Sequence, residues 1–381
     1  MTVWDALVGQ RHVVETLRVC LGGRGMTHTW LFTGPPGSGR SNAAIAFAAA
    51  IECEQDGCGE CQACHTVLVG SHPDVTVIRT ERLTLGVDEV RELVRRSALA
   101  PVASRHQVLI IEDADRLTEQ AGNALLKAIE EPTEHTIWIL CAPTVEDLLP
   151  TIRSRCRQVV LTTPTDREVA EHLITAEGVA EELAWSAARA SQGHIGRARA
   201  LALHQDVRNR RRSVVGYPTS LTGLQACLSA AADLAESTAE EATTVTGEVD
   251  AREKADLATS YGVVERGRRP REYAPALAAL EKAQKTRAKR RHLDVIDRGL
   301  MDLVSVYRDA IKLGTGADGE LINEDIRPQI VALAELSSPE AQLRRIDAIF
   351  TAREQMLEFN VPPLLALESM MLALRVPRRS A

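Results

Sequence analysis

Residues 34–41 read GPPGSGRS and follow a short apolar run. The spacing is that of a phosphate-binding loop, G-x-x-x-x-G-K-[ST], in which glycines let backbone amides surround a phosphate at a helix N-terminus. An arginine stands where the lysine belongs, and its planar guanidinium reaches phosphates differently from a compact ammonium. The motif therefore predicts a nucleotide site with impaired hydrolysis. The candidate nucleotide-binding residues of the loop are Gly34, Gly37, Gly39, Arg40 and Ser41, the last as a magnesium ligand.

An acidic pair at the end of another apolar run could complete such a site. The segment VLIIEDAD, residues 108–115, has a strand pattern that ends in Glu112 and Asp113. Nucleotide hydrolases place a magnesium ligand and a water-activating base there, usually as aspartate followed by glutamate. The order is reversed here, so the residue at the base position is one methylene shorter, and reach matters for a general base. Two solvated acids are the alternative, but the accompanying phosphate loop favours an ancestral nucleotide site.

Four cysteines in the segment CEQDGCGECQAC predict a zinc site. The spacing C-x4-C-x2-C-x2-C lets four thiolates converge on one tetrahedral ion, and sulfur ligands select zinc. Free thiols on a glycine-rich surface loop are the alternative, and a disulfide framework does not suit a reducing cytosol. His65 and His72 lie close enough in the sequence to be substitute ligands. The predicted ligands of this closed, structural site are Cys53, Cys58, Cys61 and Cys64.

Strand-like and helix-like segments alternate around these residues. Nearly continuous apolar strands separated by helices indicate a parallel sheet that is covered on both faces, which predicts an α/β fold. The expected strands are 28–32, 75–78, 107–111, 136–141 and 158–161. The helices expected between them are 41–51, 87–99 and 118–130.

From residue 165 onward the pattern is helical. The acidic segment 236–261 predicts either an exposed helix or a mobile insertion, and the basic run KTRAKRRH, residues 285–292, favours a solvated helix face. Three short helices are expected at 166–175, 179–190 and 196–204. Longer helices are expected after about residue 208, with breaks near 217–218, 269–270 and 314–319.

Composition bounds the class of protein. The chain has 381 residues, which suggests two or three domains, and only 3% aromatic residues, so aliphatic side chains must fill its cores. The formal net charge of −7 argues against a dedicated nucleic-acid binder, so any DNA contact must be local or shared with partners. No signal pattern and no apolar run of about 18 residues is present, and we expect a cytoplasmic protein.

Several motifs together resemble the AAA+ subunits of bacterial DNA polymerase III clamp loaders, a family related to replication factor C. The resemblance covers most of residues 1–205 and returns at the C-terminus. LGVDEVREL and NALLKAIEEP, followed by SRC, are highly specific to clamp-loader subunits. The motifs are LVGQ (7–10), the altered phosphate loop, the cysteine cluster, SHPDVTVI (71–78), LGVDEVREL (85–93), NALLKAIEEP (123–132), RSRC (153–156) and NVPPLLALE (360–368).

The resemblance implies three domains, which are an AAA+ nucleotide-fold domain (1–162), a small helical lid (163–207) and an all-helical collar (208–381) for oligomerisation. It also implies the partners, which are the gamma/tau and delta subunits, the sliding clamp and primer-template DNA within the complex, with no membrane. In this family the arginine of the SRC motif, here Arg155, faces ATP that is bound by the neighbouring subunit.

Four positions depart from the active gamma/tau subunits and resemble the delta prime type of subunit, which acts mainly as a stator. Active subunits carry the loop lysine, the Asp-Glu order, a threonine after the fourth strand and an arginine in the lid. Here the four positions hold Arg40, Glu112-Asp113, Ala142 and Gly196. Ala142 cannot hydrogen-bond a phosphate, and Gly196 carries no charge. We therefore expect a non-hydrolysing subunit that gives an arginine finger to its neighbour.

Two other functions remain open at this point. An active clamp-loader ATPase is favoured by the intact glycines and by Ser41, and is disfavoured by the four altered positions. A stand-alone, zinc-containing DNA-binding protein is favoured by the cysteine cluster and the basic run, and is disfavoured by the acidic total charge.

Overall fold

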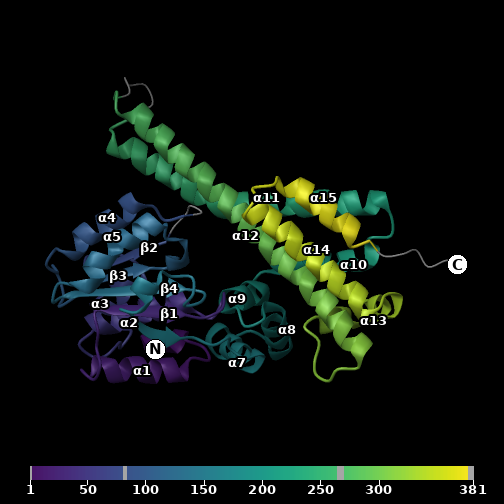
Figure 1. Cartoon of the computed structure of the whole chain (residues 1–381), viewed down its shortest axis with the longest axis horizontal. Helices are drawn as coiled ribbons and strands as arrows, with labels where there is room; N and C mark the ends of the chain where they lie inside the picture. Colours follow the sequence, from purple (N-terminus) through teal and green to yellow (C-terminus); the bar gives the residue numbers. More distant parts are fainter. Residues whose placement is uncertain (1, 80–83, 264–269, 376–381) are drawn as a thin grey trace. The chain divides into compact units, whose positions relative to one another are not determined.

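A computed structural model of the chain describes residues 2–79, 84–263 and 270–375. The chain forms two compact units, Met1–Leu203 and His204–Ala381, which are drawn from purple to yellow in Figure 1. The first unit combines a sheet with helices, and the described residues of the second unit form helices joined by loops, with no strand.

The first unit is built on a five-stranded parallel sheet with the strand order β2-β3-β4-β1-β5. Each neighbouring pair runs parallel, so the sequence-based prediction of a parallel sheet is confirmed. The strands begin and end within about two residues of the expected positions. They are β1 (Thr29–Thr33), β2 (Val75–Ile78), β3 (Gln107–Ile111), β4 (Thr136–Ala142) and β5 (Arg157–Val160).

The helices of this unit lie before, between and after the strands. The predicted helices are all present, with small shifts at their ends. Those before the first strand are η1 (Val3–Ala6) and α1 (Arg11–Leu21). Those between the strands are α2 (Arg40–Glu52), α3 (Gln62–Leu68), α4 (Val87–Ser97), η2 (Ala114–Arg116), α5 (Glu119–Glu130) and α6 (Pro150–Arg153). Those after the sheet are α7 (Asp166–Glu177), α8 (Glu181–Ser191) and α9 (Ile195–Leu203).

Successive residues of a strand point to opposite faces of the sheet, which is how one sheet supports two cores. In β4, Ile139 and Cys141 pack into a core formed with η1, α1, α2 and α3. Trp138 and Leu140 pack into a second core formed with α4, α5 and α6. Both faces of the sheet are therefore covered, as nearly continuous apolar strands require.

The second unit has its own apolar core, to which the long helices α11 and α12 both contribute. The acidic segment 236–261 is part of α11, so its interpretation as a helix is confirmed. The helices are α10 (Gln205–Ser220), α11 (Leu224–Ser260), α12 (Tyr273–Thr315), η3 (Glu324–Ile326), α13 (Arg327–Leu336), α14 (Pro339–Leu357) and α15 (Pro363–Ala373).

The three predicted helix breaks of the second unit have different outcomes. The break expected at 217–218 is wrong by a few residues, because Pro218 lies inside α10 and the helix continues to Ser220. A proline this close to a helix end removes one amide donor without interrupting a long run of hydrogen bonds. The break expected at 269–270 reaches residues outside those described. The break expected at 314–319 contains the end of α12, at Thr315.

Candidate functional site

The phosphate loop connects the end of β1 to the start of α2. Gly37 and Gly39 have φ angles of 87° and 89°, a left-handed conformation that glycine adopts at no steric cost. Gly39 is the N-cap of α2, and Ser41 is the second residue of that helix. The loop thus ends at a helix N-terminus, where the backbone favours an anion. The backbone of a phosphate-binding loop is therefore present.

A buried glutamine supports this loop from the N-terminal segment. The Gln10 Nε2 donates to the carbonyl oxygen of Thr162 at 2.6 Å and to that of Ser38 at 3.3 Å. The Gln10 Oε1 accepts from the Thr162 amide at 3.2 Å. Gln10 is the last residue of the LVGQ motif, and it joins the loop to the segment that follows β5. This supporting contact is not predicted from the motif alone.

Arg40 turns back onto its own loop. Its Nη1 donates to the carbonyl oxygen of Gly34 at 2.5 Å. Burial lowers the pKa of Arg40, while nearby groups that include the Asp115 and Asp113 carboxylates act in the opposite direction. One donor of the guanidinium is therefore occupied by the loop instead of by a phosphate.

The loop is also in contact with the residue that precedes α9. A Cβ atom on Gly37 would lie 2.6 Å from the Cβ and Cγ atoms of His194, so only glycine fits there. Gly196, the position at which active subunits carry an arginine, lies two residues further along, in α9. The segment expected to sense the nucleotide therefore approaches the loop through His194 and carries no charged group at Gly196.

Glu112 is engaged by an arginine that is not among the predicted site residues. Arg79 follows β2, the strand that pairs with β3, and Glu112 follows β3. The Arg79 Nε lies 2.5 Å from Glu112 Oε2, and its Nη2 lies 3.1 Å from Oε1. Asp113 lies 3.9 Å from the Nε of Arg116. A carboxylate held in a bidentate pair can ligate magnesium only by giving up that pair.

The sheet brings the remaining predicted positions to one edge. Since β3, β4 and β1 are neighbours and run parallel, their carboxyl ends carry Glu112, Ala142 and the phosphate loop side by side. Ala142 is fully buried and pairs in register with Thr33, the last residue of β1. It offers no polar atom beyond its backbone at the point where a γ-phosphate sensor would stand.

The four cysteines of the predicted zinc site converge. Their sulfur atoms all lie within 4.8 Å of one another. Cys53 Sγ lies 3.7 Å from Cys58 Sγ and 3.7 Å from Cys61 Sγ. A tetrahedral ion with Zn–S bonds of about 2.3 Å separates its ligand atoms by about 3.8 Å, so the donor set fits zinc. Neither His65 nor His72 belongs to the group, and His72 Nδ1 instead accepts from the Asp74 amide.

Backbone amides favour the thiolate form of Cys53, whereas burial raises the pKa of Cys64. Burial raises the pKa of Cys53, but hydrogen bonds from the amides of Cys58, Gln55 and Gly57 outweigh it and lower that pKa to about 6. Gly57 and Gly59 have φ angles of 91° and 81°, which permits the tight turns between ligands. A Cβ on Gly57 would lie 2.5 Å from a methyl group of Val3, so the loop packs closely against η1.

Arg155 lies just after α6 and its side chain is 40% exposed. Its Nη1 donates to the Thr151 carbonyl oxygen at 2.9 Å and to Ser154 Oγ at 3.2 Å. Its Nη2 forms an ion pair with Oε1 of Glu130, the last residue of α5, at 2.8 Å. Glu130 is not among the predicted site residues, although it lies in the NALLKAIEEP motif.

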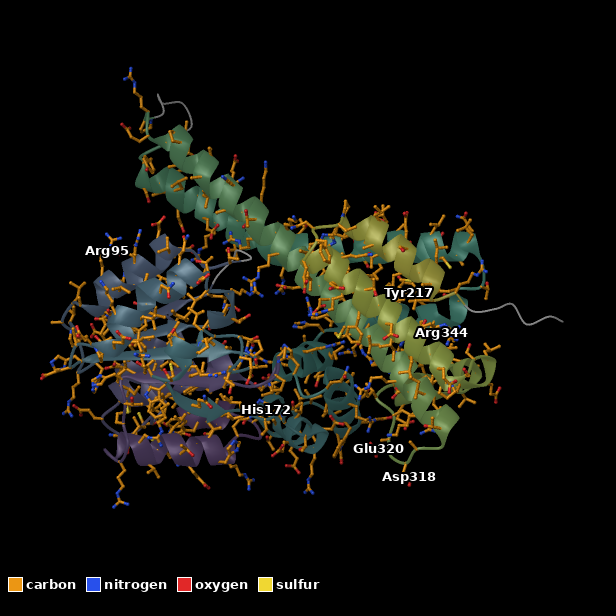
Figure 2. The ribbon with its side chains drawn as sticks, viewed as in Figure 1. Arg95, His172, Tyr217, Asp318, Glu320 and Arg344 are labelled. Carbon is orange, nitrogen blue, oxygen red and sulfur yellow. The ribbon has the colours of Figure 1, made fainter. Side chains whose placement is uncertain are left out.

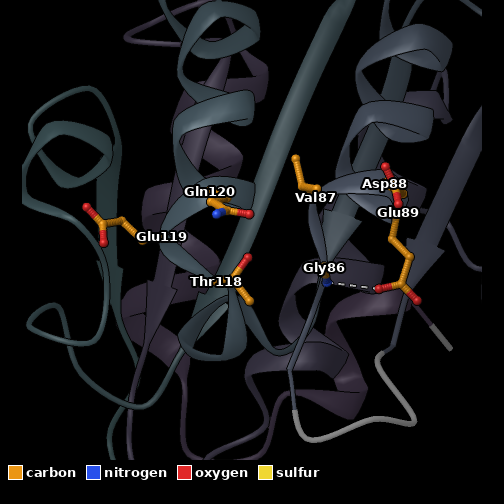
Figure 3. Close-up of a pocket in the computed structure, with 7 residues that line it drawn as sticks. All are labelled: Gly86, Val87, Asp88, Glu89, Thr118, Glu119 and Gln120. Carbon is orange, nitrogen blue, oxygen red and sulfur yellow. Dashed lines mark hydrogen bonds between the residues drawn. The ribbon is translucent and has the colours of Figure 1, made fainter.

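A pocket of about 570 Å³ lies between the first turns of α4 and α5 (Figure 3). Backbone hydrogen bonds between Leu85 and the Arg116–Thr118 segment hold these two helix starts together. The pocket is lined by acidic and neutral residues, including Glu89, whose carboxylate accepts from the Gly86 amide at 3.0 Å. None of the predicted nucleotide, zinc or finger residues lines it.

Within the described residues, no helix is both long and apolar enough to cross a membrane.

Two protein-family descriptions match the sequence. The family DNA polymerase III, delta subunit, matches residues 9–165. The family DNA polymerase III, delta subunit, C terminal, matches residues 279–375. The first match contains the phosphate loop, the cysteine cluster and Arg155, and the second runs from within α12 to the end of α15.

Individual relatives carry two different subunit names. The chain is 39% identical over 154 residues to DNA polymerase III subunit gamma/tau of Mycobacterium tuberculosis, which covers 39% of this chain and 27% of the relative. It is 38% identical over 145 residues to subunit delta' of Pseudomonas aeruginosa, which covers 36% of this chain and 44% of the relative. It is 35% identical over 185 residues to subunit delta' of Escherichia coli, which covers 47% of this chain and 55% of the relative. The chain thus spans about a quarter to about half the length of these relatives, and identity does not separate the two subunit types.

Proposed function

Because the chain belongs to the DNA polymerase III clamp-loader family, we propose that it serves there as a non-hydrolysing, stator-type subunit of the delta prime class. In this role it helps to load the sliding clamp on primed DNA during replication. The observation that carries the proposal is that four catalytic positions of one nucleotide site, at Arg40, Glu112-Asp113, Ala142 and Gly196, are all unsuited to hydrolysis.

The contacts of these residues support the loss of hydrolysis. Catalysis of phosphoryl transfer depends on positioning and on electrostatic stabilisation of the transferred group. Arg40 donates to the loop carbonyl of Gly34, and Glu112 is paired with Arg79, so each would have to give up a contact to engage ATP or magnesium. Ala142 and Gly196 have no side-chain group that could contact a phosphate. Single changes of this kind can be compensated, whereas four in one site remove most of the machinery.

Steady-state ATP hydrolysis by the purified chain tests this proposal. We expect turnover no faster than the background in the absence of protein. Robust turnover that disappears in a Ser41→Ala variant would overturn the proposal, because Ser41 acts only through magnesium bound at this loop.

An active ATPase of the gamma/tau type is the second candidate. The 39% identity to subunit gamma/tau of Mycobacterium tuberculosis favours it, as do the left-handed glycines of the loop. The same hydrolysis measurement separates the two candidates, since only this one requires turnover by the isolated chain.

We also propose that Cys53, Cys58, Cys61 and Cys64 hold one structural zinc ion. The sulfur separations of 3.7 Å and the amide hydrogen bonds to the sulfur atoms support this assignment. When bound, zinc would cross-link a loop that has little apolar content of its own. Because all four ligands come from the protein, no open position remains for catalysis.

Arg155 is proposed as an arginine finger that acts in trans on ATP bound by a neighbouring gamma/tau subunit. Its exposure and its position in the SRC motif support this role. A guanidinium supplied across a subunit boundary stabilises charge that develops on the transferred phosphoryl group.

Assembly with other subunits is proposed to involve the second unit. Leu343 and Phe350 of α14 are exposed by 52% and 46%, and the spacing of seven residues places them on one helix face. Exposed apolar side chains that recur on one face are typical of protein interfaces. The proposed partners are the gamma/tau and delta subunits, with the sliding clamp and primer-template DNA, in the cytoplasm.

A further inference from the structure

The helical hairpin of the second unit extends beyond its apolar core. We call the outer part of this hairpin the stalk. It consists of residues 240–263 and 270–291, which are the outer parts of α11 and α12 with the described residues between them. Figure 1 shows the stalk projecting past α13, α14 and α15 of the same unit. Among its described side chains, the buried apolar residues are Ala242 and Tyr273. Tyr273 packs edge-to-face on Tyr261, with ring centroids 5.9 Å apart. Along the rest of the stalk, so little apolar burial means that other interactions contribute to joining the two helices.

Polar and ionic contacts form the seam of the stalk. The Gln284 Nε2 donates to the Asp250 carbonyl oxygen and to the Glu253 carboxylate, both at 3.0 Å. The guanidinium of Arg287 donates to the carboxylates of Asp250 and Glu253 at 2.5 Å each. Lys254 pairs with Glu281 at 3.2 Å. Asp250, Glu253 and Glu281 are thus engaged within the seam.

The opposite side of α12 carries three exposed lysines, Lys282, Lys285 and Lys289. Their spacing of three and four residues places them on one helix face. Within the described residues none of the three forms an ion pair, and Lys289 Nζ donates to the Asn360 side-chain oxygen at 3.3 Å. The chain has six lysines in total, so half of them are gathered on this face.

The side chains of the basic run at 285–292 therefore lie on different faces of α12. The interpretation as a solvated helix face is wrong for Arg287, which lies in the seam with its side chain 18% exposed. It holds for Lys285 and Lys289, which face outward. Only the three-dimensional arrangement shows that the outward set includes Lys282 and excludes Arg287.

The chemistry of this lysine face fits a polyanion better than a protein surface. On α12 itself, the residues beside the lysines on this face include the small Ala278 and Thr286, and none is aromatic. Protein interfaces rely on aromatic or large apolar anchors, whereas phosphate contacts need only accessible positive charge. With a rise of about 1.5 Å per residue, the lysines span roughly 10 Å, over which duplex DNA presents several phosphates.

We propose that Lys282, Lys285 and Lys289 on the stalk bind the phosphate backbone of DNA without sequence preference. This contact supplies the local positive charge that a chain of net charge −7 needs for any DNA contact of its own. It would hold duplex DNA at the stalk of the second unit. The proposal goes beyond the proposed function and does not depend on whether the chain hydrolyses ATP.

The test is fluorescence anisotropy of a short labelled duplex with the full-length chain, between about 50 and 200 mM salt. Three phosphate contacts predict a salt slope of about 2–3, which is a loss of about 40-fold in affinity across that range. The variant Lys282→Gln, Lys285→Gln, Lys289→Gln should bind at least about tenfold more weakly at the lower salt concentration, with a flatter slope. Glutamine retains helix propensity, and circular dichroism checks that the helices persist.

A matched control removes three positive charges elsewhere in the same unit. Arg212→Gln, Arg344→Gln and Arg375→Gln together alter exposed side chains outside the stalk, one of which, Arg344, is labelled in Figure 2. We expect this control to bind within about twofold of the parent, because only long-range charge changes. Equal binding by the lysine variant and the parent, an equal loss in the control, or no binding by the parent at low salt would each overturn the proposal. None of these outcomes involves ATP, so a failure here is separate from a failure of the proposed function.

Discussion

The guanidinium of Arg155 is held by the carboxylate of Glu130, with Nη2 2.8 Å from Oε1. Both side chains are partly exposed, at 40% and 43%, so the pair is hydrated and contributes about 0–1 kcal/mol to the stability of the fold. The ion pair therefore orients the Arg155 side chain but is weak enough to be broken. A phosphate group, which carries more negative charge, can replace the Glu130 carboxylate as the partner of Arg155.

Replacing Arg155 with alanine should leave folding and assembly unchanged but lower ATP hydrolysis and clamp loading by the reconstituted complex. One finger contributes about 10³–10⁵ in rate at the site that it serves, whereas other subunits retain their own sites. We therefore expect a partial loss in the whole complex. The measurement is clamp-stimulated hydrolysis by purified, fully assembled complexes. Glu130→Gln is the matched control, because it removes the pair and keeps the finger. Parental rates in the Arg155→Ala complex would exclude the finger role.

Restoring single catalytic residues should not create an ATPase. Arg40→Lys, alone or with Arg79→Ala, should leave hydrolysis by the isolated chain at background, because Ala142 and Gly196 still offer no contact to a phosphate. Phosphate release measured against a protein-free blank gives the answer. Rapid turnover in either variant would show that the two remaining positions are dispensable.

The purified chain should contain one zinc ion. Cys61→Ser combined with Cys64→Ser removes two of four ligands, and should abolish zinc retention and lower the melting temperature by roughly 5 °C or more. Elemental analysis and thermal unfolding provide the two readouts. Cys156→Ser is the control, because that thiol lies outside the cluster and donates to the Ile152 carbonyl oxygen instead. Zinc content that is unchanged in the double variant would contradict the assignment.

Asp74 should be a major determinant of stability in the first unit. Its carboxylate accepts from the amides of Val102 and Ala103 at 2.7 Å each, and from the Ser104 amide and hydroxyl at 2.9 Å each. Asp74→Ala should therefore lower the free energy of unfolding by about 2–4 kcal/mol. Denaturant unfolding measures the change. Asp88→Ala, at a side chain that is 94% exposed, should change it by less than about 0.5 kcal/mol.

The same carboxylate should respond to acid in a defined direction. Burial raises the pKa of Asp74, but the amide and hydroxyl hydrogen bonds outweigh burial and hold the pKa below its ordinary value. Because the folded state then binds the proton less tightly than the unfolded chain, the stability that Asp74 supplies is present above about pH 4. It is lost as the pH falls through the folded-state pKa. The Asp74→Ala variant should lack this component of the acid sensitivity, which unfolding measured across that pH range would detect.

The sequence by itself determined the features that depend on residues close together in the chain. The five apolar runs predicted the five strands, because burial on both faces of a parallel sheet requires continuous apolar side chains. The four cysteines lie within twelve residues, from Cys53 to Cys64, so the chain between them is short enough to bring the sulfur atoms together. Likewise, the left-handed glycines of the phosphate loop follow from their spacing.

Only the tertiary structure decided which distant residues meet at the site. Glu112 is paired with Arg79 because β2 and β3 are neighbours, and Gln10 reaches Thr162 because the N-terminal segment packs near the end of β5. The same is true of Arg287, which turns into the stalk seam while the lysines beside it face outward. A local pattern encodes how a segment folds, whereas strand order and helix pairing arise from burial summed over the whole chain. The partners of these side chains are therefore absent from any short stretch of sequence.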